Sequence, residues 1–348
     1  MKIMIRATNW VGDAIMALPA LRAVRDKFVD AHIAVVARPY VADIYREQRV
    51  CDQLIVYNPR GQHAGFSGRE RLARDLRGQG FDVALLLQNA FDAAWLAWRA
   101  GIPKRIGYAR DGRSLLLTEA IAMPKRGETP AHEQFYYLEL LHRAGWIDEV
   151  SGQTAISLQI PEGAAARAER RLQAAGSRRG ATRIAIGAGA SYGSAKCWPP
   201  ERFARVARAL GEKFDAEAIL FGTPAEAQVS SAIVSAINRP SIDLTGTTTI
   251  AELPAMLSRC HLFIGNDSGA MHVAAAVGLP VVAVFGPTDP LGTAPLTPRC
   301  TVVRQKPYCS PCFLRRCPTD HRCMTRVSPE EVQAAADYWM SRVEVRPA

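Results

Sequence analysis

The sequence lacks the signatures of several common protein classes. It has no G-x-G-x-x-G loop, which disfavours a nicotinamide-dependent dehydrogenase, and no G-K-[ST] tripeptide that would complete a Walker A loop. Aromatic residues make up 7% of the chain and do not interleave with its basic runs, which argues against a nucleic-acid-binding protein. Because Arg6, Asn9 and Asp13 interrupt the first apolar segment, we expect no signal peptide and a cytoplasmic location.

Long apolar spans are also lacking. The longest apolar stretch, residues 269–287, contains His272 and a Gly278-Leu279-Pro280 break, which indicate a helix followed by a buried strand and not a membrane span. Apolar residues make up 48% and charged residues 22% of the 348 residues, as is typical of a soluble globular enzyme. A chain of this length suggests two domains.

Positive charge is the strongest compositional bias. The formal net charge is +10, and seven lysines or arginines lie between Arg299 and Arg326 with Asp320 as the only acid. A second basic stretch, residues 99–113, carries five lysines or arginines and one acidic residue, Asp111. This bias leaves nucleic acid, an anionic membrane surface and a phosphorylated substrate open as partners. Solvated surface arginines are the plainer alternative for both stretches.

Short runs rich in valine, isoleucine and leucine alternate with amphipathic segments in both halves of the chain. The predicted strands are 3–5, 32–36, 54–57 and 83–87 in the first half and 183–186, 218–221, 262–264 and 281–285 in the second. Such runs suit parallel strands that are buried on both faces and joined by helices. We therefore expect an α/β fold of two Rossmann-like, doubly wound domains facing a cleft, with ligands bound at the carboxyl ends of the strands.

The change from one strand series to the next predicts the domain boundaries. An Ala/Arg-rich helical stretch ending in Gly-Ser-Arg-Arg-Gly separates the two series. The predicted parts are an N-terminal domain 1–160, a linker region 161–180, a C-terminal domain 181–327 and a C-terminal helix 328–348.

The first turn between a strand and a helix carries a candidate catalytic carboxylate. Asp13 follows Gly12 at the start of a predicted helix, at the carboxyl end of the first strand. Such an aspartate is either a catalytic base or an N-cap favoured by the helix dipole. Pro19 falls inside the helical pattern that follows, which predicts a kink or a restart of the helix.

Two further strand ends have the composition of anion-binding loops. Asn266-Asp267-Ser268-Gly269 precedes a helix of small residues, whose first amides would form an anion site, and His272 lies within its first turns. The alternative is an ordinary aspartate cap and a structural histidine. The glycine-rich loop 187–199, which contains Lys196, suits a pyrophosphate, although this signal is weak on its own.

Four of the eight cysteines cluster near the C-terminus. Their spacing is C-x2-C-x4-C-x5-C, which matches no standard zinc ribbon. Four thiols so spaced suit zinc or an iron–sulfur cluster, and free thiols or a redox-sensitive loop are the alternatives. The clustered residues are Cys309, Cys312, Cys317 and Cys323.

Taken in order, these motifs resemble the ADP-heptose:lipopolysaccharide heptosyltransferases. The resemblance is carried by Trp10-Val11-Gly12-Asp13-Ala14, by the loop Gly189–Trp198 with its lysine, and by Asn266-Asp267-Ser268-Gly269-x2-His272. The segment Gly286–Pro290 is also similar to the family pattern, and the resemblance extends over nearly the whole chain. It implies a GT-B fold and an inverting transfer of L-glycero-D-manno-heptose from ADP-heptose, with no metal or other cofactor required.

The resemblance also implies roles for single residues. The family's catalytic aspartate falls on Asp13. A glutamate that holds the nucleotide ribose falls on Glu226, and Thr248 would lie near the adenine. The full set of donor-binding residues implied is Lys196, Glu226, Thr248, Asp267, Ser268, Gly269 and His272.

The acceptor implied is Kdo2-lipid A that already carries one heptose. We expect Lys104, Arg105 and Arg110 to bind this phosphorylated, acidic acceptor, and the protein to associate peripherally with the anionic inner face of the inner membrane. The alternatives within the fold are transfer of the first or third heptose, and a sugar-nucleotide epimerase or hydrolase. The alternatives outside it are a nucleic-acid-binding protein and a metal-cluster sensor.

Overall fold

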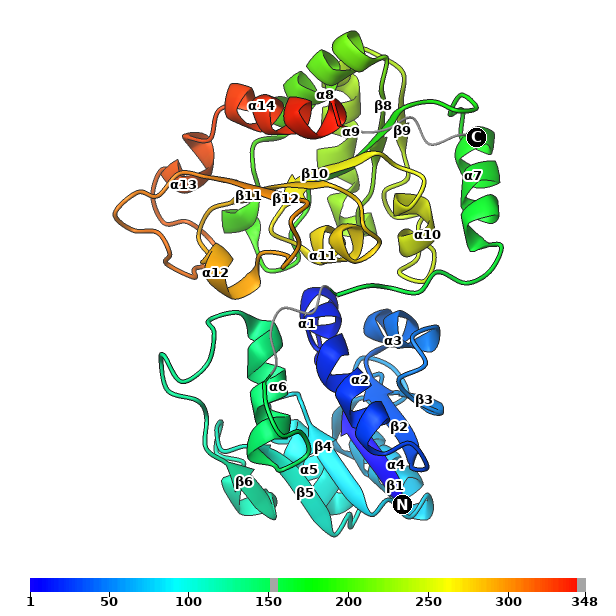
Figure 1. The fold of residues 1–348 in the computed structure, drawn as a ribbon, viewed down its shortest axis with the longest axis vertical. Helices are drawn as coiled ribbons and strands as arrows, with labels where there is room; N and C mark the ends of the chain where they lie inside the picture. The colour runs from blue at the N-terminus through cyan, green and yellow to red at the C-terminus, as the bar shows by residue number, and fades with distance from the viewer. Residues whose placement is uncertain (151–155, 343–348) are drawn as a thin grey trace. The chain divides into compact units, whose positions relative to one another are not determined.

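Both sheets of the structure consist of parallel strands with helices packed on either side (Figure 1). The computed structural model describes residues 1–150 and 156–342. Contacts divide the chain into two units, Met1–Thr154 and Ala155–Ala348, which we call unit one and unit two. The predicted α/β class is therefore confirmed for each unit.

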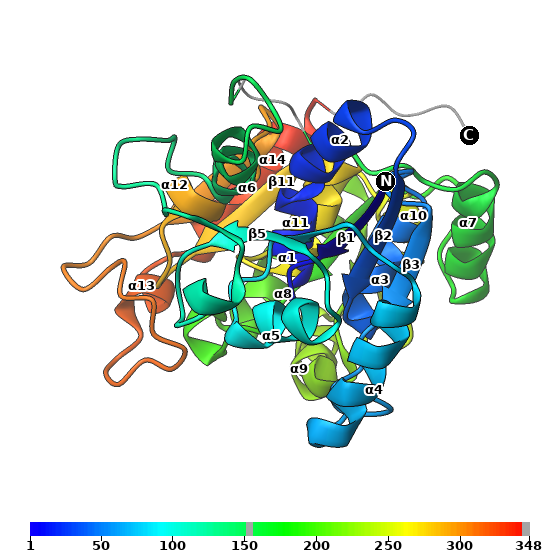
Figure 2. The same ribbon diagram turned by 90° about the horizontal axis from the view of Figure 1, so that it is seen from below.

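Unit one has a six-stranded sheet in the order β3-β2-β1-β4-β5-β6. Its strands are β1 (Lys2–Arg6), β2 (His32–Ala37), β3 (Gln53–Val56), β4 (Val83–Leu86), β5 (Lys104–Tyr108) and β6 (Glu119–Ile121). Its helices are α1 (Val11–Met16), α2 (Leu18–Lys27), α3 (Pro39–Arg46), α4 (Gly65–Gly78), α5 (Phe91–Arg99) and α6 (Glu133–Arg143), with the 3-10 turn η1 (Ser114–Leu116). Helices α2 and α6 lie on one face of this sheet, and α4 and α5 lie on the other (Figure 2).

Unit two has a second six-stranded sheet, in the order β12-β11-β10-β7-β8-β9. Its strands are β7 (Arg183–Gly187), β8 (Glu217–Leu220), β9 (Ser241–Asp243), β10 (Leu262–Asn266), β11 (Val281–Phe285) and β12 (Cys300–Arg304). Its helices are α7 (Ala164–Ala174), α8 (Pro200–Phe214), α9 (Ala227–Ile237), α10 (Leu253–Leu257), α11 (Gly269–Ala276), α12 (Pro290–Thr293), α13 (Arg322–Thr325) and α14 (Pro329–Met340), with the 3-10 turns η2 (Ser194–Lys196) and η3 (Pro224–Glu226). When this sheet is read from β9 to β12 and its strands are numbered from β7, its strand order is the same as that of unit one.

The strands expected from the sequence are those buried on both faces. Residues 3–5 and 281–285, for example, are fully buried, as parallel strands covered by helices must be. Strands β5, β6, β9 and β12 escaped prediction because they are short or carry polar residues nearer the sheet edges. The helix restart at Pro19 is confirmed, since α1 ends at Met16 and α2 begins at Leu18 with the proline in its first turn.

The predicted linker 161–180 is wrong, because these residues belong to unit two. Helix α7 packs against α10, with Leu172 fully buried, and Arg171 donates to Glu252 at 2.7 Å. The units divide at residues 154 and 155 instead. The C-terminal helix of the prediction is α14, which packs on α8 within unit two and is not a separate part.

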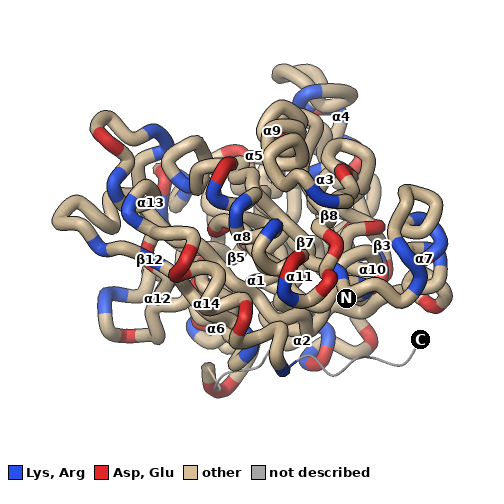
Figure 3. Tube along the Cα trace, turned by 90° about the horizontal axis from the view of Figure 1, so that it is seen from above, with Lys and Arg blue, Asp and Glu red and all other residues tan. Residues whose placement is uncertain are grey.

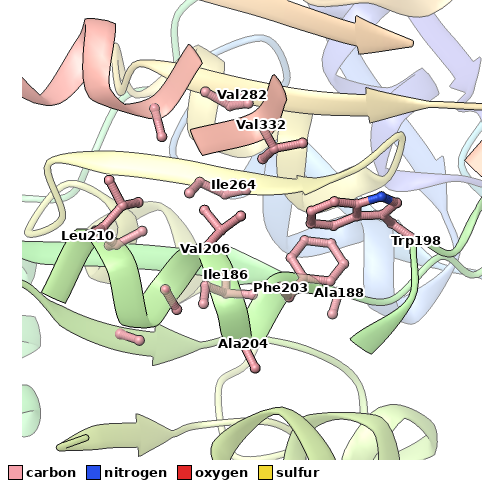
Figure 4. Packing of buried hydrophobic residues seen from close by; sticks show 14 of the residues in the cluster. Ile186, Ala188, Trp198, Phe203, Ala204, Val206, Leu210, Ile264, Val282 and Val332 are labelled. Atoms are coloured by element: carbon pink, nitrogen blue, oxygen red, sulfur yellow. The ribbon is translucent and has the colours of Figure 1, made fainter. Parts of the chain in front are cut away.

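The core of unit two lies between its sheet and helices α8, α9 and α14 (Figure 4). Trp198 and Phe203 meet edge to face, with ring centroids 4.9 Å apart, and both are buried. The Trp198 indole also donates to the Val327 carbonyl at 3.0 Å, so its one polar atom is satisfied. Among the residues that the structure describes, no helix is long and apolar enough to cross a membrane.

Candidate functional site

In unit two, the loops after β7, β10 and β11 meet at the carboxyl edge of the sheet. The strands are parallel and in register, with Gly265 paired to Gly187 and Asn266 paired to Val284. The buried Asn266 side chain ties two of the loops together. It donates to the Ala188 carbonyl at 2.6 Å and accepts from the Trp198 amide at 3.0 Å. The sequence motif included Asn266 but did not reveal this bracing role.

Lys196 and Asp267, predicted from separate motifs, form an ion pair at this edge. The Lys196 ammonium lies 2.5 Å from Oδ2 of Asp267, and both side chains are largely buried. The same carboxylate oxygen accepts a hydrogen bond of 2.7 Å from the buried Thr288 hydroxyl. Asp267 therefore holds the ammonium in place, and the remaining ammonium protons stay available to an anion. The segment Gly286–Pro290 noted in the sequence includes Thr288, but its bond to Asp267 was not foreseen, because the two residues lie 21 positions apart.

The N-terminus of α11 adjoins this ion pair. Ser268 is the N-cap residue in extended conformation, and Gly269 is the first helical residue. Ser268 makes no side-chain cap, and its buried hydroxyl has no hydrogen-bond partner within the described residues. A buried hydroxyl without a partner is costly, and a polar ligand at this edge would satisfy it. His272 is buried one turn further along the helix.

Glu226 lies directly against the glycine-rich loop. Its carboxylate accepts from the Thr223 amide at 2.6 Å. A Cβ atom at Gly189 would come within 1.8 Å of its Oε1, so a side chain at that position would have to displace the carboxylate. Thr248, in contrast, makes only a long hydrogen bond of 3.4 Å to the Leu244 carbonyl. In the described part of the chain, no hydrogen bond or ion pair joins Thr248 to Lys196 or Asp267.

In unit one, Asp13 lies in the first turn of α1, after the carboxyl end of β1. The N-cap residue is Trp10, so Asp13 is not the N-cap, although its place in the first turn is one that the helix dipole favours. Asp13 is partly buried and lies close enough to the buried Tyr45 and Tyr137 to affect their hydroxyls. Burial raises the pKa of both tyrosines, and the negative charge of Asp13 raises it further. Both hydroxyls therefore stay protonated beside the carboxylate.

Two buried arginines at the same edge were not foreseen. Arg6 donates to the Ala7 carbonyl at 2.5 Å and to Oδ1 of Asn9 at 2.8 Å, and burial lowers its pKa to about 10. Arg113 donates to the carbonyls of Tyr108 and Gln88. Burial also lowers the pKa of Arg113 to about 10. The only sequence signal for Arg6 was a charged residue inside an otherwise apolar strand end.

The three predicted acceptor-binding residues do not lie together. Lys104 and Arg105 begin β5, at the amino end of the sheet, while Arg110 follows its carboxyl end. Lys104 pairs with Glu119 at 2.8 Å, and Arg105 donates to the backbone carbonyls of 102, 103 and 116. Of the three, only Arg110 is placed where ligands bind in such sheets. A hydrogen bond with the Tyr136 hydroxyl raises the pKa of Arg110.

All four clustered cysteines are free thiols in unit two. Cys309 and Cys312 are exposed, Cys317 is partly exposed and Cys323 is buried. Within residues 1–150 and 156–342, no three histidine, cysteine or acidic side chains stand close enough together to hold one metal ion. The metal hypothesis for this cluster therefore stays a prediction.

Comparison with known proteins gives consistent matches over most of the chain. The model of glycosyltransferase family 9 (heptosyltransferase) matches residues 69–322. Lipopolysaccharide heptosyltransferase 2 of Salmonella typhimurium is 30% identical over 312 residues, which cover 87% of this chain and 88% of that protein. Its counterpart in Escherichia coli is 29% identical over 313 residues, with the same coverage. The solved structure of E. coli ADP-heptose lipopolysaccharide heptosyltransferase II superimposes with a TM-score of 0.83 at 25% identity, covering 98% of this chain and 99% of that chain.

Proposed function

The chain belongs to glycosyltransferase family 9, the heptosyltransferases, and from that premise we propose that it adds the second heptose to the inner core of lipopolysaccharide. The donor is ADP-L-glycero-D-manno-heptose, and the acceptor is Kdo2-lipid A that carries the first heptose. This is the reaction of heptosyltransferase II, after which the similar proteins of S. typhimurium and E. coli are named. The GT-B fold expected from the sequence agrees with the superposition.

The Lys196–Asp267–Thr288 arrangement is the observation that carries the proposal. When the bond between the heptose and ADP breaks, negative charge grows on the departing diphosphate. The Lys196 ammonium and the first amides of α11 supply positive charge at one edge, and Ser268 adds a free hydroxyl. Because Asp267 fixes the ammonium before the donor binds, little reorganisation is needed as this charge develops.

Asp13 serves as the general base. It takes the proton from the attacking heptose hydroxyl of the acceptor, while that oxygen bonds to the anomeric carbon on the face opposite ADP. Attack from the opposite face inverts the anomeric configuration. One carboxylate suffices, because ADP leaves without needing a proton from an acid, whereas glycosidases use two carboxylates. The reaction proposed requires no metal, since Lys196 and the helix amides stabilise the leaving group.

The remaining donor contacts that we propose are those implied by the family resemblance. Glu226, held against Gly189, would bind the ribose hydroxyls, and His272 would donate to a phosphate or brace α11. Thr248 would contact the adenine through the loop after β9, whose Gly246 amide donates to the Gly222 carbonyl at 2.9 Å. On the acceptor side, Arg110 is retained as a contact to acidic Kdo or phosphate groups. The protein would act in the cytoplasm at the inner face of the inner membrane.

The decisive experiment measures ADP release by purified protein given ADP-heptose, with and without the singly heptosylated Kdo2-lipid A. Release should depend on the acceptor. It should fall about 10²–10⁴-fold in Asp13→Asn, while ADP-heptose binding by calorimetry stays unchanged. Release without acceptor would indicate a hydrolase or epimerase instead. Turnover on unheptosylated Kdo2-lipid A would indicate transfer of the first heptose, and an Asp13→Asn variant with wild-type turnover would overturn the role of Asp13.

A further inference from the structure

The loop between β12 and α13 exposes large apolar side chains, of which Tyr308 has the Arg322 guanidinium 5.3 Å from its ring centre. In the segment 306–316, which we call the docking loop, Tyr308 is 89% exposed, Phe313 56% and Leu314 45%. The orange loop extends away from the sheet of unit two (Figure 1). Exposed apolar residues are ordinary when scattered, but three within seven residues concentrate apolar surface on one loop, which favours a partner.

The same loop carries positive charge without compensation. Lys306, Arg315 and Arg316 are exposed, and in the described ranges no acidic side chain forms an ion pair with any of them. The nearest acid in sequence, Asp320, already pairs with Arg322 at 2.8 Å. Basic residues gather around α13 in the charge view of the chain (Figure 3). The patch is therefore both apolar and cationic.

The backbone of the docking loop is fixed to unit two. The amides of Cys312 and Phe313 both donate to the Pro287 carbonyl, at 3.0 and 2.8 Å. The Ser310 hydroxyl donates to the Gly286 carbonyl at 2.8 Å, and Tyr192 donates its hydroxyl proton to the Phe313 carbonyl at 2.6 Å. Because these hydrogen bonds already fix the backbone around Phe313, the chain would lose little conformational entropy when a partner binds.

We propose that the docking loop binds the surface of an anionic lipid bilayer. Tyr308, Phe313 and Leu314 would enter the boundary between headgroups and acyl chains, where aromatic and aliphatic side chains partition favourably. Lys306 and Arg316 would contact the anionic headgroups, which attract basic residues near the surface. Because the loop carries both apolar and basic side chains, a negatively charged membrane suits it better than a purely apolar partner does.

Docking through this loop would also hold the proposed donor site close to the membrane surface. The Arg315 carbonyl accepts from the Ala195 amide at 3.1 Å, and the His321 ring lies 2.7 Å from the Ala195 carbonyl. Because Ala195 precedes Lys196, the membrane-bound loop and the phosphate-binding lysine share one short backbone connection. Docking thus holds the donor edge of unit two near the surface that contains a lipid acceptor. This last step rests on the proposed function, whereas the membrane binding itself does not.

Vesicle sedimentation with the full chain tests the proposal. The vesicles are phosphatidylcholine with or without phosphatidylglycerol, and a reductant keeps Cys309 and Cys312 as thiols. We expect binding to the anionic vesicles only. Phe313→Ser/Leu314→Ser and Lys306→Gln/Arg316→Gln should each weaken it about 10- to 30-fold, and salt should weaken it further.

A matched control makes the same kinds of change elsewhere. Phe66→Ser, on a ring of unit one that is 70% exposed, and Arg167→Gln/Arg170→Gln on α7 should leave binding unchanged. The proposal would be overturned if the protein bound both vesicle types equally. It would also be overturned if the docking-loop variants bound like the wild type, or if the control variants lost as much binding as they do. Sedimentation of the protein without vesicles would overturn it as well, by pointing to self-association.

A second readout separates this proposal from the proposed function. With a water-soluble acceptor fragment, the docking-loop variants should keep wild-type ADP release, and with acceptor embedded in anionic vesicles they should be slower by a similar factor. If no acceptor supports turnover but vesicle binding and its loss in the variants persist, the proposed function fails and the docking surface stands. Unchanged thermal melting shows that the variants are folded.

Discussion

In unit one and in unit two, the loops at the carboxyl edge follow the same sheet order, but the cations at that edge have different partners. In unit one, most hydrogen bonds of the Arg6 and Arg113 guanidinium groups go to backbone carbonyls. Lys196 in unit two instead meets a side-chain carboxylate that also accepts from Thr288. A guanidinium surrounded by carbonyls stabilises loops, whereas an ammonium held by one carboxylate keeps protons for a ligand anion.

The largest effect is expected when Lys196 is replaced, which tests this comparison directly. Lys196→Ala should lower kcat/KM for ADP-heptose by about 10²–10³-fold, because it removes a charge that stabilises the leaving group. Steady-state ADP release measures the change. Lys213→Ala is the matched control, since that lysine forms an ion pair with Asp337 at 2.9 Å on the surface and should have wild-type kinetics. Equal losses in the two variants would contradict a specific role for Lys196.

The corresponding change in unit one should affect stability. Arg113→Ala leaves the carbonyls of Gln88 and Tyr108 without their buried donor, at a cost of about 2–4 kcal/mol in unfolding free energy. Urea denaturation followed by circular dichroism measures this. Arg113→Lys should not restore stability, because an ammonium cannot reproduce the planar fork of a guanidinium. The exposed Arg110→Ala provides the contrast, and a larger loss there would refute the distinction.

A smaller effect is expected from crowding Glu226. In Gly189→Ala the new methyl group overlaps the Glu226 carboxylate and must displace it, which should raise the donor KM roughly tenfold. Isothermal calorimetry with ADP checks the affinity directly. Gly78→Ala, in a helix with open space around the Cβ position, should leave binding intact and stabilise the protein slightly. Unchanged ADP affinity in Gly189→Ala would argue against Glu226 as a ribose contact.

The smallest expected effect concerns an ion pair of unit two that lies outside the candidate site. Arg183 donates to both carboxylate oxygens of Glu169, at 2.6 and 2.7 Å, which lowers the pKa of Glu169 to about 2. A lowered folded-state pKa stabilises the protein above the ordinary value of 4.5, and this stabilisation is lost as the pH falls to about 2.

Glu169→Gln should therefore lower stability at pH 7 by about 1 kcal/mol, after allowance for solvent screening of the pair. Melting temperatures of variant and parent should converge on acidification. A constant difference down to pH 2 would mean that packing, and not charge, is what the substitution removes.

The sequence predicted the parts of the molecule that depend on local pattern. Runs such as 3–5 and 281–285 became central strands, because continuous apolar runs bounded by turns have few other stable arrangements. The Asn-Asp-Ser-Gly motif likewise indicated the helix N-terminus that the structure has at Gly269. These features need only neighbours in sequence to be recognised.

What the sequence did not reveal depends on partners far apart in the chain. Thr288 bonds to Asp267 across two strand ends, and Arg113 reaches Gln88 25 residues earlier. Lys104 and Arg105 appeared to belong with Arg110 because they are close in sequence, yet the length of β5 separates them. Helix α7 resembled a linker because it is rich in alanine and arginine, and its buried Leu172 alone signalled packing.

The contact between Trp198 and Val327 has a consequence for the order in which the protein matures. All strands of unit one precede residue 155, so its core can close while the rest of the chain is still being synthesised. Trp198 and Arg202 both donate to the Val327 carbonyl, and α14 then packs on α8. The loop that carries Lys196 therefore reaches its final packing only after Val327 has been synthesised, later than the core of unit one.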